Sequence, residues 1–342
     1  MNTAKVVRFH QLGGPEVLKI EDLPLESPKA GEVRIRVQAI GLNRAEVMFR
    51  TGNYLERPEF PSRIGLEAAG IVDAVGSDVT RVKVGDRVSV ATGQSIGRYG
   101  TYGESAIVPA ASAIAYPPNL TPEQAASVWV QYLTAYFAFV DLAALQPGQS
   151  VLITAATGGA GLGAIQLARL LGATVIAATR SAAKKQPLLD AGAHHVIIAD
   201  KESLAARVKE ITKGQGANLI FDPIAGPTLP ALAEAVAWGG QIVLYGALGG
   251  VDTPYPLWTA LARNFSLRAY IVYNYCGLST LGLPRKEEAF GRAIAVIHEH
   301  LAAGRLKPII AKIFPLDQIQ AAHHYMESNQ QLGKIVVTSG AS

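Results

Sequence analysis

The chain has 342 residues, 49% of them hydrophobic and 17% charged, with a net charge of +4. This length allows a large core and predicts two domains rather than one. Basic residues are spread along the chain, which argues against a nucleic-acid partner, and the modest positive balance suits an anionic cofactor. The most apolar helix candidate, Ser127–Leu145, is interrupted by polar residues. Because it falls short of a membrane span, no membrane partner is expected.

The chain has one cysteine, Cys276, so an intrachain disulfide and a cysteine-cluster zinc site are excluded. The first residues, MNTAKVVRFHQLGG, lack the apolar core of a signal peptide. A reducing compartment suits a protein without disulfides. The sequence therefore predicts a cytoplasmic protein.

The first 125 residues predict many short strands separated by turns. Alternating or β-branched apolar residues indicate strands at Val33–Ala39, Ala69–Val75 and Arg87–Ala91. A short helix is expected over Arg44–Arg50, and the turn after it, Thr51–Tyr54, directs a tyrosine outward. Together these elements predict a compact, barrel-like β domain.

Residues 126–276 predict a doubly wound α/β domain. At its boundary Thr121 caps a helix, with Pro122 at the first position and Gln124 in the capping-box position. Strands then alternate with helices, as in a parallel sheet. The six expected strands are Ser150–Ala155, Thr174–Thr179, His195–Ala199, Ala217–Asp222, Gly240–Tyr245 and Leu267–Tyr273.

The last segment, 277–342, returns to short elements and is expected to complete the first domain. A helix is predicted over Arg285–Ala303. Strands are predicted at Ile309–Phe314 and Lys334–Thr338.

The stretch Val151–Gly163, VLITAATGGAGLG, combines a buried strand with a glycine turn and the start of a helix. Glycines let the backbone turn sharply and approach a pyrophosphate, whose charge then lies on unpaired amides at the helix start. A second strand follows the helix, which completes the context that this motif needs. The expected cofactor contacts are Thr157, Gly158, Gly159, Ala160, Gly161, Leu162 and Gly163.

The end of the second strand distinguishes NAD from NADP. NAD enzymes place an acid there for the ribose hydroxyls, whereas an adenosine 2′-phosphate needs a cation. Here the strand is followed by Arg180 and Ser181, with Lys184 in the next turn and no acid among them. A guanidinium, a hydroxyl and an ammonium suit a phosphate, so the predicted cofactor is NADPH.

Five stretches together resemble one enzyme family: GGPEVLKIED, AIGLNRAEVMFRTGNY, GLEAAGIVDAVGSDVTRVKVGDRV, TAATGGAGLGAIQLARLLGA and GKIVV. The family is the quinone oxidoreductase (zeta-crystallin-like) group, the zinc-independent branch of the medium-chain dehydrogenase/reductases. The resemblance implies an α/β protein with a GroES-like β-barrel catalytic domain at 1–125, completed by 277–342. It also implies a Rossmann NADPH-binding domain at 126–276, an active site in the cleft between them, and a homodimer through the last Rossmann strand.

The same resemblance implies roles for individual residues. Tyr54 matches the active-site tyrosine of quinone oxidoreductases and of enoyl-thioester reductases, and Asn43 matches the asparagine of the preceding loop. Met48 replaces a tyrosine of bacterial quinone reductases, and Tyr132 stands where some relatives have glycine. Both changes would make the substrate cleft narrower or more apolar.

The nicotinamide end of the cofactor is held in the family by backbone after the later strands. Asp222, Tyr245 and Gly246 occupy those places here, and Tyr136 lies near them by resemblance. These four residues complete the expected cofactor and substrate contacts.

Ligand chemistry argues against a catalytic zinc. The G-H-E-x-x-G motif of zinc alcohol dehydrogenases reads GLEAAG at Gly65–Gly70, and Leu66 has no lone pair to offer. The adjacent pairs His194–His195 and His323–His324 are interpreted as surface or strand-end histidines, since neighbours on a strand face opposite ways. Without a Lewis acid, alcohol oxidation is disfavoured, and reduction of a quinone or an activated C=C bond remains.

Three functions stay open. The first is an NADPH-dependent reductase of quinones or α,β-unsaturated carbonyl compounds, in which Tyr54 donates a proton or hydrogen bond. The second is an enoyl-thioester (acyl-CoA) reductase, and the third is a non-enzymatic, crystallin-like NADPH-binding protein. The second is favoured by basic residues near Tyr54 in sequence, namely Arg44, Arg50, Arg57 and Arg63.

Overall fold

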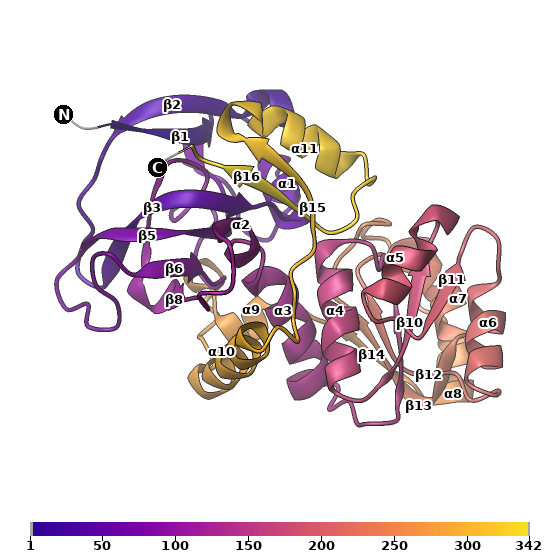
Figure 1. Cartoon of the computed structure of the whole chain (residues 1–342). Helices are drawn as coiled ribbons and strands as arrows, with labels where there is room; N and C mark the ends of the chain where they lie inside the picture. Colours follow the sequence, from indigo (N-terminus) through magenta and orange to yellow (C-terminus); the bar gives the residue numbers. More distant parts are fainter. Residues whose placement is uncertain (1–2, 341–342) are drawn as a thin grey trace. The chain divides into compact units, whose positions relative to one another are not determined.

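The computed structural model describes residues 3–340 (Figure 1). Within them the chain divides into two compact units, one running up to Val130 and resuming at Tyr273, the other spanning Gln131–Val272. The expected domain boundaries, 125/126 and 276/277, lie a few residues from these divisions. In the described part of the chain, no helix is long and apolar enough to cross a membrane.

The first unit contains two sheets. In the larger sheet the strand order is β15-β16-β3-β5-β6-β8, with β7 paired to β3, and the smaller has the order β2-β1-β4. The strands are β1 (Thr3–Phe9), β2 (Lys19–Pro24), β3 (Glu32–Gly41), β4 (Ser62–Arg63), β5 (Glu67–Val75), β6 (Arg87–Val90), β7 (Ser105–Pro109), β8 (Ala113–Ala115), β15 (Ile310–Pro315) and β16 (Lys334–Thr338).

Strand β3 shows why this sheet has an apolar core. Its sequence EVRIRVQAIG alternates, and successive side chains of a strand point to opposite faces. Val33, Ile35 and Val37 are fully buried, whereas Arg34 and Arg36 are half-buried. Burying a side chain of this size stabilises the folded state by about 1.5–3 kcal/mol relative to leaving it exposed.

The C-terminal strands join this sheet. β16 pairs antiparallel with β3, with Val336 opposite Gly41, and parallel with β15. In Figure 1 these yellow strands lie beside the indigo β3. The last segment of the chain is therefore part of the same sheet as the N-terminal strands.

Helices close the ends and one side of the first unit. The expected capping box is confirmed, because Thr121 accepts a hydrogen bond from the Gln124 amide at 3.3 Å. The helices are α1 (Arg44–Arg50), α2 (Pro122–Ala125), α9 (Tyr273–Cys276), α10 (Glu287–Ala302) and α11 (Ile319–Glu327). Short 3-10 turns are η1 (Pro15–Val17), η2 (Ala110–Ser112), η6 (Ser279–Leu281) and η7 (Leu316–Gln318).

The second unit is a six-stranded, wholly parallel sheet with the order β11-β10-β9-β12-β13-β14. The predicted doubly wound fold is confirmed. The strands are β9 (Ser150–Ile153), β10 (Thr174–Thr179), β11 (His195–Ile198), β12 (Ala217–Asp222), β13 (Val236–Leu244) and β14 (Ser266–Ala269). The helical segments are α3 (Trp129–Tyr136), the π-helix η3 (Phe137–Leu142), α4 (Gly159–Leu170), η4 (Ala182–Lys184), α5 (Lys185–Asp190), α6 (Leu204–Ile211), η5 (Gly226–Thr228), α7 (Leu229–Ala233) and α8 (Leu257–Arg263).

The last of the predicted strands is shorter than expected. β14 ends at Ala269, and Tyr273 begins the helix α9 rather than ending a strand. The apolar and aromatic run that follows Leu267 has the composition of a strand, and composition alone does not separate a buried strand from a buried turn.

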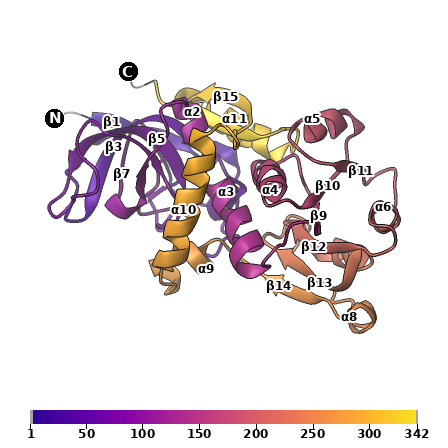
Figure 2. The same ribbon diagram turned by 60° about the horizontal axis from the view of Figure 1, so that its bottom comes forward.

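Helices cover both faces of the parallel sheet (Figures 1 and 2). On one face Leu152, Ile176 and Ile220 pack with side chains of α6, α7 and α8. On the other face Phe221 contacts Phe139 of η3 edge to face at 5.1 Å. Burial on both faces explains the nearly continuous apolar sequences of these strands.

The strand order reverses beside β9. From β9 the chain proceeds to β10 and β11 on one side, then crosses to β12, β13 and β14 on the other. At such a switch point the loops after the two central strands diverge and leave a crevice at the carboxyl edge of the sheet. The glycine turn after β9 and the loop after β12 both lie at this edge.

Candidate functional site

Gly158 and Gly161 serve different purposes in the turn after β9. A Cβ on Gly161 would lie 2.7 Å from the backbone of Ala156, so close packing requires this glycine. A Cβ on Gly158 would meet only the Ala155 carbonyl oxygen, at 3.7 Å, and would otherwise enter open space. Gly158 is the N-cap of α4, whose first amides have no partner within the helix. An anion can therefore approach this backbone closely.

Tyr132 packs beneath the same helix. Its side chain is fully buried, its hydroxyl donates to Gln166 Oε1 at 3.1 Å, and a Cβ on Gly163 would lie 3.3 Å from its ring. Tyr136 is also buried and contacts Phe137 edge to face. The expectation that Tyr132 narrows a substrate cleft is not supported by this burial, which gives it a packing role.

Two cations lie together after β10. Arg180 is exposed, and Ser181 and Lys184 are half-buried. Burial lowers the pKa of the Lys184 ammonium, and repulsion by the Arg180 charge lowers it further. A dianionic phosphate between them would relieve this repulsion.

Asp222 shapes the loop after β12. Its carboxylate accepts hydrogen bonds from the amides of Ile224 and Ala225, at 3.1 and 2.6 Å, and from the Thr154 hydroxyl. Burial nevertheless raises the pKa of this carboxyl. Its side chain thus ties β9 to β12 at the switch point, and its contact with a cofactor stays a prediction.

The loops after β12 and β13 are bound to each other. The Tyr245 amide donates to the Asp222 carbonyl at 2.9 Å, and the Tyr245 ring stacks on Phe221 with centroids 3.9 Å apart. A Cβ on Gly246 would lie 2.8 Å from the Pro223 carbonyl oxygen. Gly246 is therefore required by the close approach of the two loops.

In the first unit, Tyr54 lies in the turn that follows α1. Its side chain is half-buried, and its Oη is 3.4 Å from Oη of Tyr273. Burial, with smaller contributions from the Glu46 and Glu56 charges, raises the Tyr54 pKa to about 12. The phenol is therefore neutral at physiological pH.

Glu56 anchors the loop that carries Tyr54. Its buried carboxylate accepts hydrogen bonds from the amides of Ile96 and Gly97, each at 3.3 Å, and from the Ser95 hydroxyl. No sequence motif indicated this contact, because the two loops are far apart in the chain.

The side chain of Asn43 forms hydrogen bonds with other residues of the first unit. Its Nδ2 donates to the Gly41 carbonyl and to Glu67 Oε2, at 3.2 and 3.1 Å, and its Oδ1 accepts from Lys334 Nζ at 2.6 Å. It also caps α1, where Glu46 accepts a hydrogen bond from the Asn43 amide. The backbone and the side chain of Asn43 thus both hold the start of α1 in place. Met48 lies half-buried on the same helix.

A buried ion pair supports this arrangement. Lys334 Nζ is 2.6 Å from Glu67 Oε2, and these side chains are only 4% and 1% exposed. Glu67 also accepts a hydrogen bond from the Val130 amide at 2.8 Å. Burial raises the pKa of nearby Glu46 to about 7, against the opposing effect of the Lys334 charge. Sequence reasoning missed Lys334, whose GKIVV stretch contains no chemical signal.

The interpretation of His323 as a surface or strand-end histidine is wrong, and Arg50 and Arg44 are less available as surface cations than the sequence suggested. His323 lies inside helix α11, not at a surface or strand end, and burial lowers its pKa to about 3. Arg50 is wholly buried and ion-paired with Glu327, and Arg44 donates to the Met326 carbonyl at 3.0 Å. Within residues 3–340 no three His, Cys, Asp or Glu side chains gather as metal ligands.

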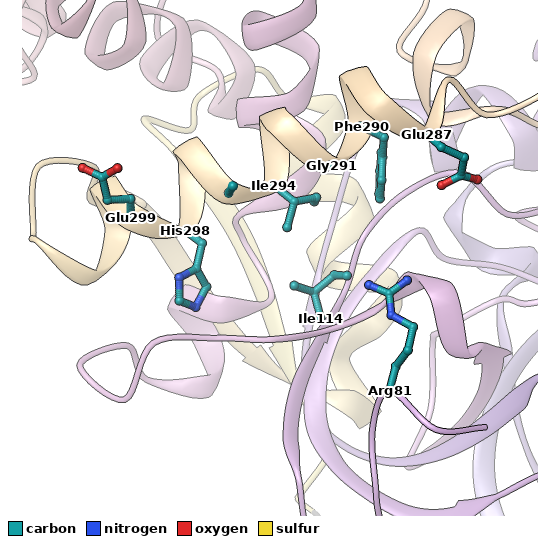
Figure 3. A pocket seen from close by; sticks show the side chains of 9 residues that line it. Arg81, Ile114, Glu287, Phe290, Gly291, Ile294, His298 and Glu299 are labelled. Carbon is teal, nitrogen blue, oxygen red and sulfur yellow. The ribbon is translucent and has the colours of Figure 1, made fainter.

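A surface cavity of about 610 Å³ lies elsewhere in the first unit. Figure 3 shows Arg81 and Ile114 facing Phe290, Ile294 and His298 of α10. None of the residues predicted for the site lines it, so it contributes no group to the candidate site.

Comparison with known proteins identifies the family. Residues 29–118 match the alcohol dehydrogenase GroES-like domain and 159–283 the zinc-binding dehydrogenase model. The quinone oxidoreductase of Pseudomonas aeruginosa is 34% identical, with 98% of this chain and 99% of that protein covered. The chain belongs to the quinone oxidoreductase family. It is therefore an oxidoreductase of the medium-chain dehydrogenase/reductase class, as the sequence predicted.

Two further proteins are similar to this chain over most of its length. The synaptic vesicle membrane protein VAT-1 homolog of Rattus norvegicus is 31% identical, covering 96% of this chain and 82% of that protein. The structure of Escherichia coli quinone oxidoreductase complexed with NADPH is 31% identical, with a TM-score of 0.87 and coverage of 98% and 99%.

Proposed function

We propose that this protein is an NADPH-dependent reductase of quinones or α,β-unsaturated carbonyl compounds. The observation that carries the proposal is the neutral, half-buried phenol of Tyr54, held at the end of α1 by a loop that Glu56 anchors. A neutral phenol donates a hydrogen bond to a carbonyl oxygen and stabilises it as negative charge develops.

NADPH fits the residues present in the second unit. The open space at Gly158 and the first amides of α4 suit a pyrophosphate, and Arg180, Ser181 and Lys184 suit a 2′-phosphate. The family includes the NADPH complex of the Escherichia coli protein, which supports this assignment. When bound, NADPH supplies the hydride that reduces the acceptor.

Replacing Arg180 by Ala is expected to weaken NADPH binding roughly tenfold or more, because a charge-assisted hydrogen bond is worth about 1.5–3 kcal/mol. NADH binding should barely change, since NADH lacks the 2′-phosphate. Dissociation constants for both cofactors, measured by fluorescence titration, test this. Arg207→Ala removes a half-buried guanidinium of the same unit, which pairs with Glu202 and Glu210, and serves as the control. Equal losses for NADPH and NADH would refute the assignment.

We also propose that the reaction needs no metal. Leu66 is buried in the apolar core, and Glu67 is paired with the ammonium of Lys334. Activity should therefore survive exhaustive chelation, and elemental analysis should find no stoichiometric zinc. One zinc per chain, with activity lost on its removal, would contradict this proposal.

The enoyl-thioester alternative was favoured by basic residues near Tyr54 in sequence, and most of these are not exposed. Of the four arginines near Tyr54 in sequence, Arg50 is buried in an ion pair, and Arg44 and Arg63 have pKa values lowered by burial. Arg57 is the exposed one of the four. A basic surface for an acyl-CoA phosphate thus has less support than the sequence suggested, and a crystallin-like binding protein would not need the Tyr54 phenol.

An isotope experiment tests the proposed reaction. The protein is incubated with an enone and NADPH deuterated at the transferred position of the nicotinamide, and the product is analysed by mass spectrometry. Hydride transfer to carbon predicts one deuterium in the saturated product. A reduced product that contains hydrogen from solvent only would contradict the proposal.

We propose a homodimer through β14. This strand lies at the edge of the sheet, and large apolar side chains are exposed around α8. Trp258 is 82% exposed, and exposed patches of this kind mark interfaces. Trp258→Lys should raise the dimer dissociation constant by tenfold or more in sedimentation equilibrium. The control Val84→Lys, on an exposed residue of the first unit, should not. A wild-type monomer at micromolar concentration would refute the dimer.

The remaining partner predictions rest on the sequence alone. A small-molecule substrate, a cytoplasmic location and the lack of nucleic-acid or membrane partners stay predictions.

A further inference from the structure

Tyr54 has a second tyrosine as its neighbour. Tyr273, the first residue of α9, is 1% exposed, and its Oη lies 3.4 Å from Tyr54 Oη. Both residues belong to the first unit. Tyr54 keeps some exposed surface, whereas Tyr273 is enclosed. Tyr54 is therefore the more accessible of the two tyrosines.

The direction of this hydrogen bond matters, because either hydroxyl is able to donate. In the structure the Tyr54 hydroxyl donates to the Tyr273 oxygen. A hydroxyl hydrogen rotates about its C–O bond, so when a substrate oxygen takes the Tyr54 hydrogen, the Tyr273 hydroxyl is able to donate to the Tyr54 oxygen instead. A separation of 3.4 Å is long for two hydroxyls, and such bonds tighten when charge develops.

Tyr54 also needs such a donor. Desolvation of its half-buried phenol and the charges of Glu46 and Glu56 oppose the formation of a phenolate. Giving up a proton is therefore harder than for a phenol in water. A hydrogen bond donated to the Tyr54 oxygen offsets this effect, because it becomes charge-assisted as the proton leaves.

We propose that Tyr273 is a positioning residue for the reduction: its hydroxyl orients the Tyr54 phenol and stabilises the Tyr54 oxygen while the Tyr54 proton moves to the substrate. In this step the O–H bond of Tyr54 breaks, an O–H bond forms on the enolate oxygen, and water then reprotonates Tyr54. The inference rests on the proposed role of Tyr54 and adds a second phenol to it.

The test is a double-mutant cycle with an enone substrate. Tyr273→Phe keeps the ring and removes the hydroxyl that contacts Tyr54, so kcat should fall roughly tenfold with little change in KM. In the Tyr54→Phe background the same change should have no further effect, because the two phenols act as one unit. Tyr116→Phe is the control, since the Tyr116 hydroxyl accepts a hydrogen bond from Arg87 Nε, at 3.2 Å, elsewhere in the same unit.

Fluorine NMR of the cofactor-free protein supplies a readout that does not depend on turnover. With 3-fluorotyrosine at position 54, Tyr273→Phe should raise the pH midpoint of its ionisation, and Tyr116→Phe should not. A label at position 273 should shift its resonance in the Tyr54→Phe variant, which tests the contact even if Tyr273→Phe fails to fold.

The outcomes separate this inference from the proposed function. Full activity of Tyr54→Phe on enones would refute the role of Tyr54. A large loss in Tyr54→Phe, with Tyr273→Phe unchanged or with additive effects, would refute only the role of Tyr273. If the fluorine signal of each labelled tyrosine is unchanged when the other tyrosine is replaced by Phe, the role of Tyr273 is refuted as well.

Discussion

Replacing Tyr54 by Phe is expected to lower kcat/KM for enone or enoyl substrates by about 10²–10⁴-fold, the usual contribution of a general acid. The phenol is neutral at physiological pH and is the group proposed to meet the developing enolate oxygen. Quinones should lose far less, because a reduced quinone takes its protons readily from solvent. The NADPH dissociation constant should hardly change, since the predicted cofactor contacts belong to the second unit and Tyr54 to the first.

Both substrate classes must be measured on the same preparation. Tyr116→Phe controls for the loss of a buried tyrosine hydroxyl in the same unit. If Tyr54→Phe retains wild-type kcat/KM on every substrate, the tyrosine is only a packing residue.

Replacing Lys334 by Met is expected to destabilise the protein by about 3–5 kcal/mol, the cost of leaving a buried charge unpaired. Glu67 is 1% exposed, and Lys334 is its ion-pair partner. The same change removes the donor to Asn43 Oδ1, so the start of α1 loses a contact too. Urea unfolding followed by circular dichroism measures the free energy of unfolding.

Two further variants identify the cause of this loss. Adding Glu67→Gln to Lys334→Met removes the unpaired charge while keeping an acceptor for the Val130 amide, so part of the stability should return. Lys19→Met removes an exposed lysine of β2 and should cost less than about 1 kcal/mol. A loss for Lys334→Met no larger than for Lys19→Met would show that the pair is not a structural support.

Local patterns predicted the strands of the second unit, except for the extent of β14, and the position of its glycine turn. The strand, glycine turn and helix at Val151–Gly163 lie within one stretch of sequence, and the six strands are marked by short apolar runs. Gly158 and Gly161 then differ in a way that the motif does not show, because only the folded backbone reveals which glycine borders open space.

Contacts between distant residues could not be predicted in this way. Lys334 and Glu67 are 267 residues apart, and Tyr273 and Tyr54 are 219 apart. The sequence suggested that Arg50 belongs to a basic surface. In the structure its side chain is buried and pairs with Glu327 of α11. Residue type and local spacing do not say which charges meet after folding, so the roles of such residues depend on the structure.

We propose that the protein reduces quinones or enones with NADPH and without a metal. The most direct measurement is NADPH consumption by the chelated, purified protein with a panel of quinones, enones and enoyl-CoA esters, followed by the near-ultraviolet absorbance of NADPH. We expect turnover with quinones or enones, and faster turnover with NADPH than with NADH. Tight NADPH binding with no consumption by any acceptor would contradict it and favour the non-enzymatic alternative, and turnover restricted to enoyl-CoA esters would contradict the proposed substrate class.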